Sequence, residues 1–298
     1  AVDLDCQRDS TFQSRGAALM LKVAVPNKGI LSDSAISMLK EAGYAVRRDS
    51  AELHLVDEQN QIEFFYLRPR DIATYVGSGS LDVGFTGLDL LLDSRSKAVS
   101  VSDLGFGGST FRFAGPVGKF SKLSDLAGKR VATAYPHLVE DFLKNQDIKV
   151  ELVQLDGAVE VAVQLGVADA VADVVSTGNT LRQAGLEIFG PVILQSSAQL
   201  IVAPGKQGEH TQLLRRMQGV LVAREYVIFD YDCPTNLVDQ ASAITPGIES
   251  PTISPLREAD WVAVRALVKT SEINAKMDEL YEIGARAILV SAIHAARI

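Results

Sequence analysis

The stretch ADVVSTGNTL, residues 172–181, has the composition of a phosphate-binding turn. An apolar run that carries one acid, Asp173, gives way to a glycine among hydroxyl and amide side chains: Ser176, Thr177, Gly178, Asn179 and Thr180. Glycine lets the backbone turn tightly, and the free N–H groups at a helix start attract an anion. Asp173 would repel a phosphate, but it would accept hydrogen bonds from sugar hydroxyls. The stretch predicts a 5-phosphoribosyl site; a plain helix N-cap beside a solvated acid is the alternative interpretation.

Basic residues follow other predicted strands. Lys28 comes after LKVAVP, and Arg68 and Arg70 come after IEFFYL. Ligands of open α/β sheets bind beyond the carboxyl ends of the strands, and ammonium and guanidinium groups both suit phosphate oxygens. Arg112 lies within a predicted strand, where it needs either an anionic ligand or an internal salt bridge. An ordinary exposed loop remains the simpler interpretation of Lys28 taken alone.

An aromatic residue and three acids complete the set of candidate site residues. Tyr135 lies at a strand–helix junction, where its ring can stack on a base or a sugar. Asp156, Glu160 and Asp169 lie in QLDGAVEVAVQLGVADA, and acids near a bound pyrophosphate indicate Mg²⁺. The alternatives are a strand-start role for Asp169 and a solvated helical position for Glu160.

No activated nucleophile is found in the sequence. It lacks Gly-x-Ser-x-Gly, a Cys/His pair and a Walker loop. The two cysteines and four widely spaced histidines form no disulfide framework or zinc motif. A net charge of −8 argues against a general binder of nucleic acid or anionic membranes. The pattern favours chemistry by positioning and charge stabilisation between two bound substrates.

The length and patterning predict several compact units. The chain has 298 residues, 47% of them hydrophobic, without an apolar run of the roughly 18 residues that a membrane span needs. Few cysteines and the absence of a signal-like segment predict a cytoplasmic protein in a reducing setting. Residues 1–19 are polar, and we interpret them as a disordered N-terminal extension.

Strands and helices alternate from residue 21 to about residue 200, which predicts largely parallel sheets covered on both faces. Residues 79–91 and 166–181 both read Gly-x-x-Asp, apolar strand, Thr-Gly, helix; they suggest two related lobes facing a cleft, with chance similarity as the alternative. After about residue 205 the order becomes βαββαβ, typical of a ferredoxin-like domain.

Taken together, several motifs resemble the ATP phosphoribosyltransferase family, the first enzyme of histidine biosynthesis, in its long form. They are VAVPNKG, FFYLRPRDIATYVGSGSLDVGFTGLDLL, LGFGGSTFRFA, ATAYP, LDGAVEVAVQLGVADAVADVVSTGNTL and ITPGIESPTISPL. The resemblance implies an α/β fold with a two-lobed, periplasmic-binding-protein-like catalytic core and a C-terminal ferredoxin-like regulatory domain. It implies lobe I in residues 20–108 and 200–222, lobe II in 109–199, and the regulatory domain in 223–298.

The implied reaction joins N1 of ATP to C1 of phosphoribosyl pyrophosphate (PRPP), releases pyrophosphate and requires Mg²⁺, held mainly through the substrate phosphates. The resemblance places Asp173 on the ribose hydroxyls and residues 176–180 around the 5-phosphate. It places a second set toward ATP and pyrophosphate: Lys28, Arg68, Asp89, Tyr135, Asp156 and Glu160.

The long form also implies feedback inhibition by L-histidine and assembly into homodimers and hexamers. The matching positions for histidine are Asp232, Thr252, Leu267 and Ala287. Two rival functions are a solute-binding protein, which shares the two-lobed fold, and a different PRPP-dependent transferase. Transferases of the latter kind usually carry two adjacent acids before their Thr-rich loop, whereas Val174 follows Asp173 here.

Overall fold

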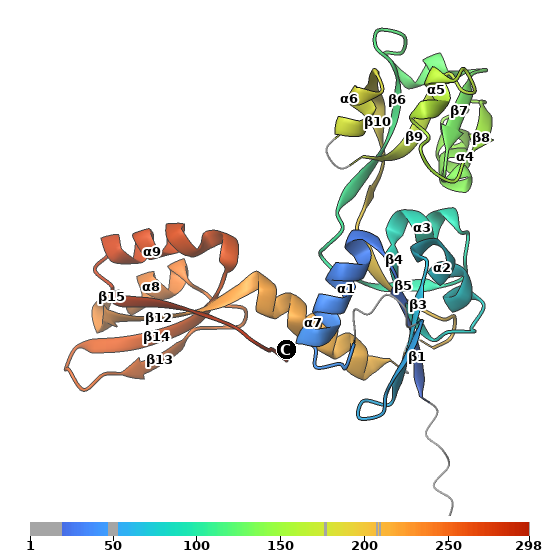
Figure 1. The fold of residues 1–298 in the computed structure, drawn as a ribbon. Helices are drawn as coiled ribbons and strands as arrows, with labels where there is room; N and C mark the ends of the chain where they lie inside the picture. The colour runs from blue at the N-terminus through green and yellow to red at the C-terminus, as the bar shows by residue number, and fades with distance from the viewer. Residues whose placement is uncertain (1–19, 47–52, 176–177, 207, 209, 298) are drawn as a thin grey trace, which may run out of the picture.

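The computed structural model describes residues 20–46, 53–175, 178–206, 208 and 210–297. The expected disorder of residues 1–19 and the predicted roles of Ser176 and Thr177 lie outside the described residues. Two α/β lobes sit one above the other, and a third domain stands to the side at the end of a long helix (Figure 1).

Lobe I is built on a six-stranded sheet of order β2-β3-β1-β4-β11-β5. Its strands are β1 (Leu21–Pro26), β2 (His54–Asp57), β3 (Ile62–Leu67), β4 (Val83–Gly87), β5 (Val99–Asp103) and β11 (Ala198–Val202). Its helices are α1 (Gly29–Glu41), α2 (Pro69–Gly77) and α3 (Leu88–Asp93). The side chains of α1 pack on one face of the sheet and those of α2 and α3 on the other, so the central strands are apolar on both sides.

Lobe II is built on a five-stranded sheet of order β10-β6-β9-β7-β8. Its strands are β6 (Ser109–Pro116), β7 (Arg130–Thr133), β8 (Glu151–Gln154), β9 (Ala170–Val175) and β10 (Leu186–Ser196). Its helices are α4 (Pro136–Lys144), α5 (Val161–Gln164) and α6 (Asn179–Gln183), with a 3₁₀ turn at Leu123–Leu126. The aromatic residues Phe111, Phe113 and Phe189 fill the core on the α4 side, and smaller aliphatic residues fill the side of α5 and α6.

The prediction of largely parallel sheets is correct for only part of each sheet. Strand β1 pairs in parallel with β3 and β4, and β7 pairs in parallel with β8 and β9. In contrast, β11 is antiparallel to β4 and β5, and β6 is antiparallel to β9 and β10. The chain enters lobe II between β5 and β6 and returns between β10 and β11, and the strands of these crossovers make these antiparallel pairs. The hairpin of β2 and β3 adds an antiparallel pair at the edge of lobe I.

The C-terminal domain has the predicted βαββαβ order. It contains β12 (Tyr226–Pro234), α8 (Val238–Ile244), β13 (Thr252–Pro255), β14 (Trp261–Lys269), α9 (Ile273–Glu282) and β15 (Arg286–Ala292), with 3₁₀ turns at Thr235–Leu237 and Thr270–Glu272. The sheet order β13-β14-β12-β15 is that of a ferredoxin-like fold. Alternate residues of β12 point into the core with α8 and α9, and the other residues form the opposite face.

Helix α7 (Thr211–Glu225) joins lobe I to the C-terminal domain. Leu213, Met217 and Val220 belong to the core of lobe I, and the helix leads directly into β12. The C-terminal tail packs back on this helix, since the backbone of Ala296 lies against Gly219. Within the described part of the chain, no helix is both long and apolar enough to cross a membrane.

Gly84 in β4 gives a test of the packing between α2 and the sheet of lobe I. A Cβ atom there would lie 2.5 Å from Cγ2 of Ile72 and 2.9 Å from Cγ2 of Val76. We expect Gly84→Ala to lower the free energy of unfolding by about 1–3 kcal/mol, because overpacking forces neighbouring groups to shift. Urea unfolding followed by circular dichroism measures this. Gly108→Ala is the control, since no atom of the described residues lies within 4 Å of its added methyl group; equal midpoints for both variants would contradict this packing of α2 on β4.

Candidate active site between the two lobes

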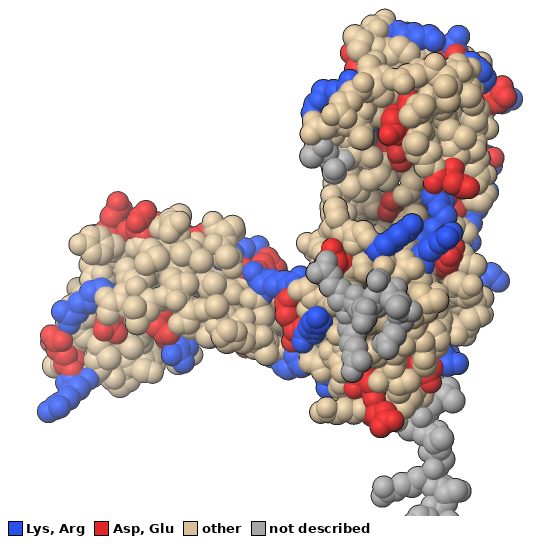
Figure 2. Space-filling model, in the orientation of Figure 1, with Lys and Arg blue, Asp and Glu red and all other residues tan. Residues whose placement is uncertain are grey.

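The predicted residues gather where the carboxyl ends of strands in the two lobes face each other. Arg68 and Arg70 follow β3, and Asp89 follows β4 in lobe I. Tyr135 follows β7, and Asp173 lies near the end of β9 in lobe II. At the boundary between the lobes, Lys and Arg side chains gather on the lobe I side, with Asp and Glu side chains opposite them on lobe II (Figure 2).

Asp173 is a half-buried carboxylate beside other acids. Burial raises its pKa to about 6, and the charges of Glu160 and Asp89 add to the rise. The backbone N–H of Val174 donates to Asp173 Oδ1 at 2.8 Å and, with the charge of Arg70, opposes the rise. Because Asp89 and Arg70 belong to lobe I, the electrostatic environment of Asp173 is set by both lobes.

Asp89 is held at the point where the chain returns from lobe II. It is 7% exposed, and the hydroxyl of Ser196 donates to its Oδ1 at 2.8 Å. The backbone N–H of Asp89 donates to the same hydroxyl at 3.1 Å, and the N–H of Leu88 donates to the carbonyl of Ser197. These bonds fix the start of α3 to the crossover between β10 and β11.

Tyr135 lies between the two lobes. Burial raises its pKa well above the usual value, and Asp89 adds to the rise. The guanidinium carbon of Arg70 lies 4.8 Å from the centroid of the Tyr135 ring, and the ring of Phe111 meets it edge-on at 5.1 Å. The phenol is therefore neutral, and one face of its ring is covered by a cation from the other lobe.

Asp93, at the end of α3, joins the lobes directly. Its Oδ1 accepts the backbone N–H groups of His137 and Leu138 at 3.0 and 3.1 Å, and its Oδ2 accepts from Arg70 at 3.0 Å. The His137 Nδ1 lies 2.8 Å from the carbonyl oxygen of Asp93 and so carries the donated proton. Nearby, Arg95 forms ion pairs with Glu140 and Asp141 on α4.

The described part of the predicted phosphate turn has the expected backbone. Gly178 has φ +69°, a left-handed conformation that favours glycine, and it precedes α6. Asn179 and Thr180 are exposed in the first turn of α6, and Arg182 donates to Oδ1 of Asn179 at 2.5 Å. The turn thus leaves the start of α6 accessible from solvent.

Three further predicted residues are exposed at the ends of strands. Lys28 and Arg68 occupy the N-cap positions of α1 and α2, and Asp156 lies in the loop after β8. The hydroxyl of Thr86 donates to the carbonyl of Pro69 at 3.0 Å and fixes the start of α2 against β4.

Two residues considered for chemistry have structural partners. Asp169 accepts from the backbone and guanidinium of Arg130 at 3.0 and 3.3 Å, and the hydrogen bond from the Arg130 side chain is the main cause that lowers its pKa. The strand-start interpretation of Asp169 is therefore the correct one. Arg112 lies opposite Asp173 in the β6–β9 pair and donates to the carbonyl of Gly190 at 3.1 Å, while its buried Nε has no hydrogen-bond partner among the described residues.

The residues predicted to bind histidine fall into two groups on the C-terminal domain. Thr252 and Leu267 line a cavity of about 430 Å³ on the face of the sheet opposite α8 and α9. Asp232 lies farther along β12, opposite Ala263 of β14, and Ala287 is exposed on the edge strand β15. Within one chain, the structure does not bring Asp232 and Ala287 into that cavity.

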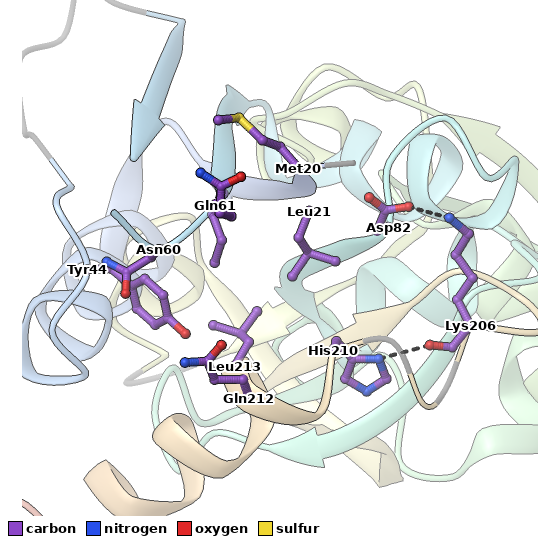
Figure 3. Close-up of a pocket in the computed structure, with 11 residues that line it drawn as sticks. Met20, Leu21, Tyr44, Asn60, Gln61, Asp82, Lys206, His210, Gln212 and Leu213 are labelled. Atoms are coloured by element: carbon purple, nitrogen blue, oxygen red, sulfur yellow. Dashed lines mark hydrogen bonds and ion pairs between the residues drawn. The ribbon is translucent and has the colours of Figure 1, made fainter. Parts of the chain in front are cut away.

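A separate cavity of about 260 Å³ opens at the amino ends of β1, β3 and β4 in lobe I (Figure 3). Met20, Gln61 and Leu213 line it, and the ion pair of Lys206 with Asp82 lies at its side at 2.7 Å. The ring of His210 contacts the carbonyl of Lys206 at 3.0 Å. None of the predicted site residues lines this cavity, so it is distinct from the cleft between the lobes.

No group of three or more His, Cys, Asp or Glu side chains with metal-binding geometry occurs among the residues that the structure describes. The charges of Glu160 and Asp89 act on Asp173, but the three side chains do not form such a group.

The fold and the cleft define a class: a two-lobed α/β core, with polar groups from both lobes facing one space, joined to a ferredoxin-like domain. The ATP phosphoribosyltransferase family matches residues 68–219, and the family described as HisG, C-terminal domain, matches residues 223–295. This chain belongs to the ATP phosphoribosyltransferase family and is an enzyme of the pentosyltransferase class.

Individual relatives agree with this assignment. An ATP phosphoribosyltransferase of Arthrobacter sp. (strain FB24) is 61% identical over 286 residues, covering 94% of this chain and all of the relative. One of Micrococcus luteus is 57% identical over 282 residues, with the same coverage. A solved structure, the ATP phosphoribosyl transferase (HisG:HisZ) complex from Thermotoga maritima, matches with a TM-score of 0.59 and 29% identity over 68% of this chain and 98% of that chain.

Sequence reasoning missed three residues of the cleft: Ser196, Asp93 and His137. Ser196 ends β10 in a plain Ser-Ser pair, and its role depends on a partner 107 residues away. Asp93 looks like a solvated acid at a helix end, although its position after TGLDLLL on the same short helix as Asp89 was a usable signal.

The charge coupling around Asp173 can be tested without substrate. We expect Glu160→Gln to lower the pKa of Asp173 from about 6 toward the usual value of an aspartate, because one like charge is removed. A carboxyl-carbon NMR titration of selectively labelled aspartate measures it. Glu151→Gln, an exposed acid at the start of β8, should leave the pKa unchanged; identical titration curves for both variants would refute the coupling.

Proposed function

We propose that this enzyme transfers the phosphoribosyl group of PRPP to N1 of ATP with Mg²⁺, forming phosphoribosyl-ATP in the first step of histidine biosynthesis, and that L-histidine inhibits it. The observation that carries the proposal is the position of Asp173. It lies at the end of β9, just before the glycine turn of α6, and faces Asp89 and Arg70 of the other lobe. An acid for ribose beside a turn for phosphate suits PRPP on lobe II.

Asp173 would bind the ribose hydroxyls, and residues 176–180 would hold the 5-phosphate. With a pKa of about 6, Asp173 is mostly ionised at neutral pH and accepts hydrogen bonds from both hydroxyls. The N–H groups at the start of α6 and the hydroxyl of Thr180 would donate to the phosphate oxygens.

The second substrate would lie on the side formed by lobe I and Tyr135. Tyr135 offers a neutral ring for stacking on the adenine, and Lys28 and Arg68 at helix starts would contact phosphate oxygens of ATP or pyrophosphate. Asp89, held by Ser196, would orient the polar groups between the two substrates.

Mg²⁺ fits this set of acids and anionic substrates. Its ligands would be mainly the substrate phosphates, with Glu160 and Asp156 as the acids that contact the ion or its waters, and it would supply charge neutralisation of the pyrophosphate. The chain's own residues would hold the two substrates in line and exclude water from the anomeric carbon.

The chemistry needs no residue that creates a nucleophile. The N1 lone pair of adenine attacks C1, and the bond from C1 to pyrophosphate breaks, so positive charge develops at C1 as in glycoside chemistry. The charge of Asp89 acts on Asp173, and both carboxylates would stabilise the positive charge at C1. Orientation and charge would thus replace a catalytic dyad.

Asp173→Ala tests the assignment. We expect kcat/KM for PRPP to fall at least about 100-fold, because hydrogen bonds to a charged acceptor contribute roughly 1.5–3 kcal/mol each. A coupled pyrophosphate assay with ATP, PRPP and Mg²⁺ measures the loss, and circular dichroism verifies the fold. Glu151→Ala is the control. Normal formation of phosphoribosyl-ATP by Asp173→Ala would refute the role of this residue, and a wild-type chain that forms none would refute the function.

Histidine inhibition would act through the C-terminal domain. Asp232 is a natural partner for the cationic amino group, and Thr252 and Leu267 line a cavity on the same face of the sheet. Because Asp232 and Ala287 lie outside that cavity in a single chain, a complete histidine site would combine residues of two subunits. That arrangement agrees with the proposed homodimers and hexamers.

We expect Asp232→Ala to raise the histidine concentration for half-inhibition about tenfold or more, because a charged hydrogen bond is lost, while the uninhibited rate stays unchanged. Titrating histidine into the pyrophosphate assay measures this. Asp239→Ala, an exposed acid on α8 at the other face of the sheet, is the control. Equal inhibition of all three proteins would remove Asp232 from the effector site.

A further inference from the structure

We propose that Asp93 is a positioning residue: a single carboxylate of lobe I caps helix α4 of lobe II and holds Arg70 against Tyr135, so that both lobes present their cleft groups in one fixed arrangement. This inference rests on the proposed function, because it gives the aromatic residue and the cation of the cleft a common support.

The first contact of Asp93 replaces a missing helix cap. Helix α4 begins at Pro136, and Tyr135 at its N-cap position provides no capping side chain. The N–H groups of His137 and Leu138 would otherwise be unpaired, and both donate to Oδ1 of Asp93 at 3.0 and 3.1 Å. A carboxylate at this position also interacts favourably with the helix dipole. Helix α4 therefore receives its N-cap from the other lobe, as the facing ends of α3 and α4 illustrate (Figure 1).

The second contact fixes a cation. Oδ2 of Asp93 accepts from Arg70 at 3.0 Å, and the carboxylate is 6% exposed whereas the Arg70 side chain is 46% exposed. The buried acid thus anchors one end of a guanidinium whose other surface covers the ring of Tyr135 at 4.8 Å. Tyr135 immediately precedes the helix that Asp93 caps, so the same carboxylate determines the position of the ring and of the cation over it.

A third contact makes the arrangement specific. The Nδ1–H of His137 donates to the backbone carbonyl of Asp93 at 2.8 Å. Backbone and side chain of Asp93 are both bonded to the first turn of α4, which limits rotation between α3 and α4. The exposed ion pairs of Arg95 with Glu140 and Asp141 lie beside this contact but hold no cleft residue, and they provide a natural comparison.

Loss of this support should reduce the rate more than the binding of either substrate. Groups on the two lobes remain, but their alignment across the cleft is lost, and a displacement of about 1 Å can reduce a rate about 100-fold. We expect Asp93→Asn to lower kcat by about 10- to 100-fold and to change KM for ATP and PRPP by less than about threefold. An amide keeps an oxygen acceptor and a similar volume but removes the charge that anchors Arg70.

Steady-state kinetics of Asp93→Asn, Arg70→Met and the double variant measure the coupling. If Asp93 acts partly through Arg70, the fold-decrease in kcat of the double variant is smaller than the product of the fold-decreases of the two single variants. Arg95→Gln removes the neighbouring exposed ion pairs and should keep kcat within about twofold. Circular dichroism verifies folding, and because its side chain is largely exposed, Arg70→Met keeps the test available if Asp93→Asn is unstable.

A substrate-free readout separates this inference from the proposed function. With 3-fluorotyrosine introduced at position 135, we expect the ¹⁹F resonance to shift or broaden in Asp93→Asn and to remain unchanged in Arg95→Gln. Wild-type kcat together with an unchanged resonance in Asp93→Asn would overturn the positioning role. A changed resonance in a protein that makes no phosphoribosyl-ATP even as wild type would instead contradict the function.

Discussion

Helix α3 is the physical link on which the cleft depends. It has only six residues, Leu88–Asp93, and an acid near each end has a partner outside its own segment. Asp89 bonds to Ser196 at the chain's return from lobe II, and Asp93 bonds to the first turn of α4. A reaction between two bound substrates needs groups from two bodies in register. This short helix holds the two lobes in alignment. It belongs to lobe I, but one of its acids bonds to α4 of lobe II and the other bonds to the end of β10, where the chain returns from lobe II.

The charge distribution of the cleft follows from that arrangement. Burial raises the pKa of Asp173 to about 6, and the charges of Glu160 and Asp89 add to the rise. Such a group of acids suits ribose hydroxyls and a developing positive charge, but it is unfavourable for phosphates unless cations accompany them. The basic residues lie at the rim, at helix starts and over the Tyr135 ring. The anionic ends of the substrates would therefore lie at the periphery and the reacting carbon near the acids.

Much of this was predictable from sequence because the relevant signals are local. The βαββαβ order, the helix starts at Pro69 and Pro136, and the glycine turn at Gly178 depend on nearby residues and were predicted correctly. The antiparallel direction of β6 and β11 was not, because it depends on where the chain crosses between the lobes. The bond of Ser196 to Asp89 and the cap that Asp93 provides join segments that are 107 and about 44 residues apart. Neither residue type nor spacing specifies such a partner.

The connection between lobe I and the C-terminal domain bears on regulation. Helix α7 is part of the lobe I core through Met217 and Val220, and it continues without a loop into β12, the strand that carries Asp232. The tail after β15 packs back on this helix at Gly219, so both lobe I and the C-terminal tail contact α7. A ligand on the sheet of the C-terminal domain can influence the cleft only if it favours one position of this helix over another. Lobe I would then move as a body with α7. That movement would change the boundary between α3 and α4, where hydrogen bonds join the two lobes.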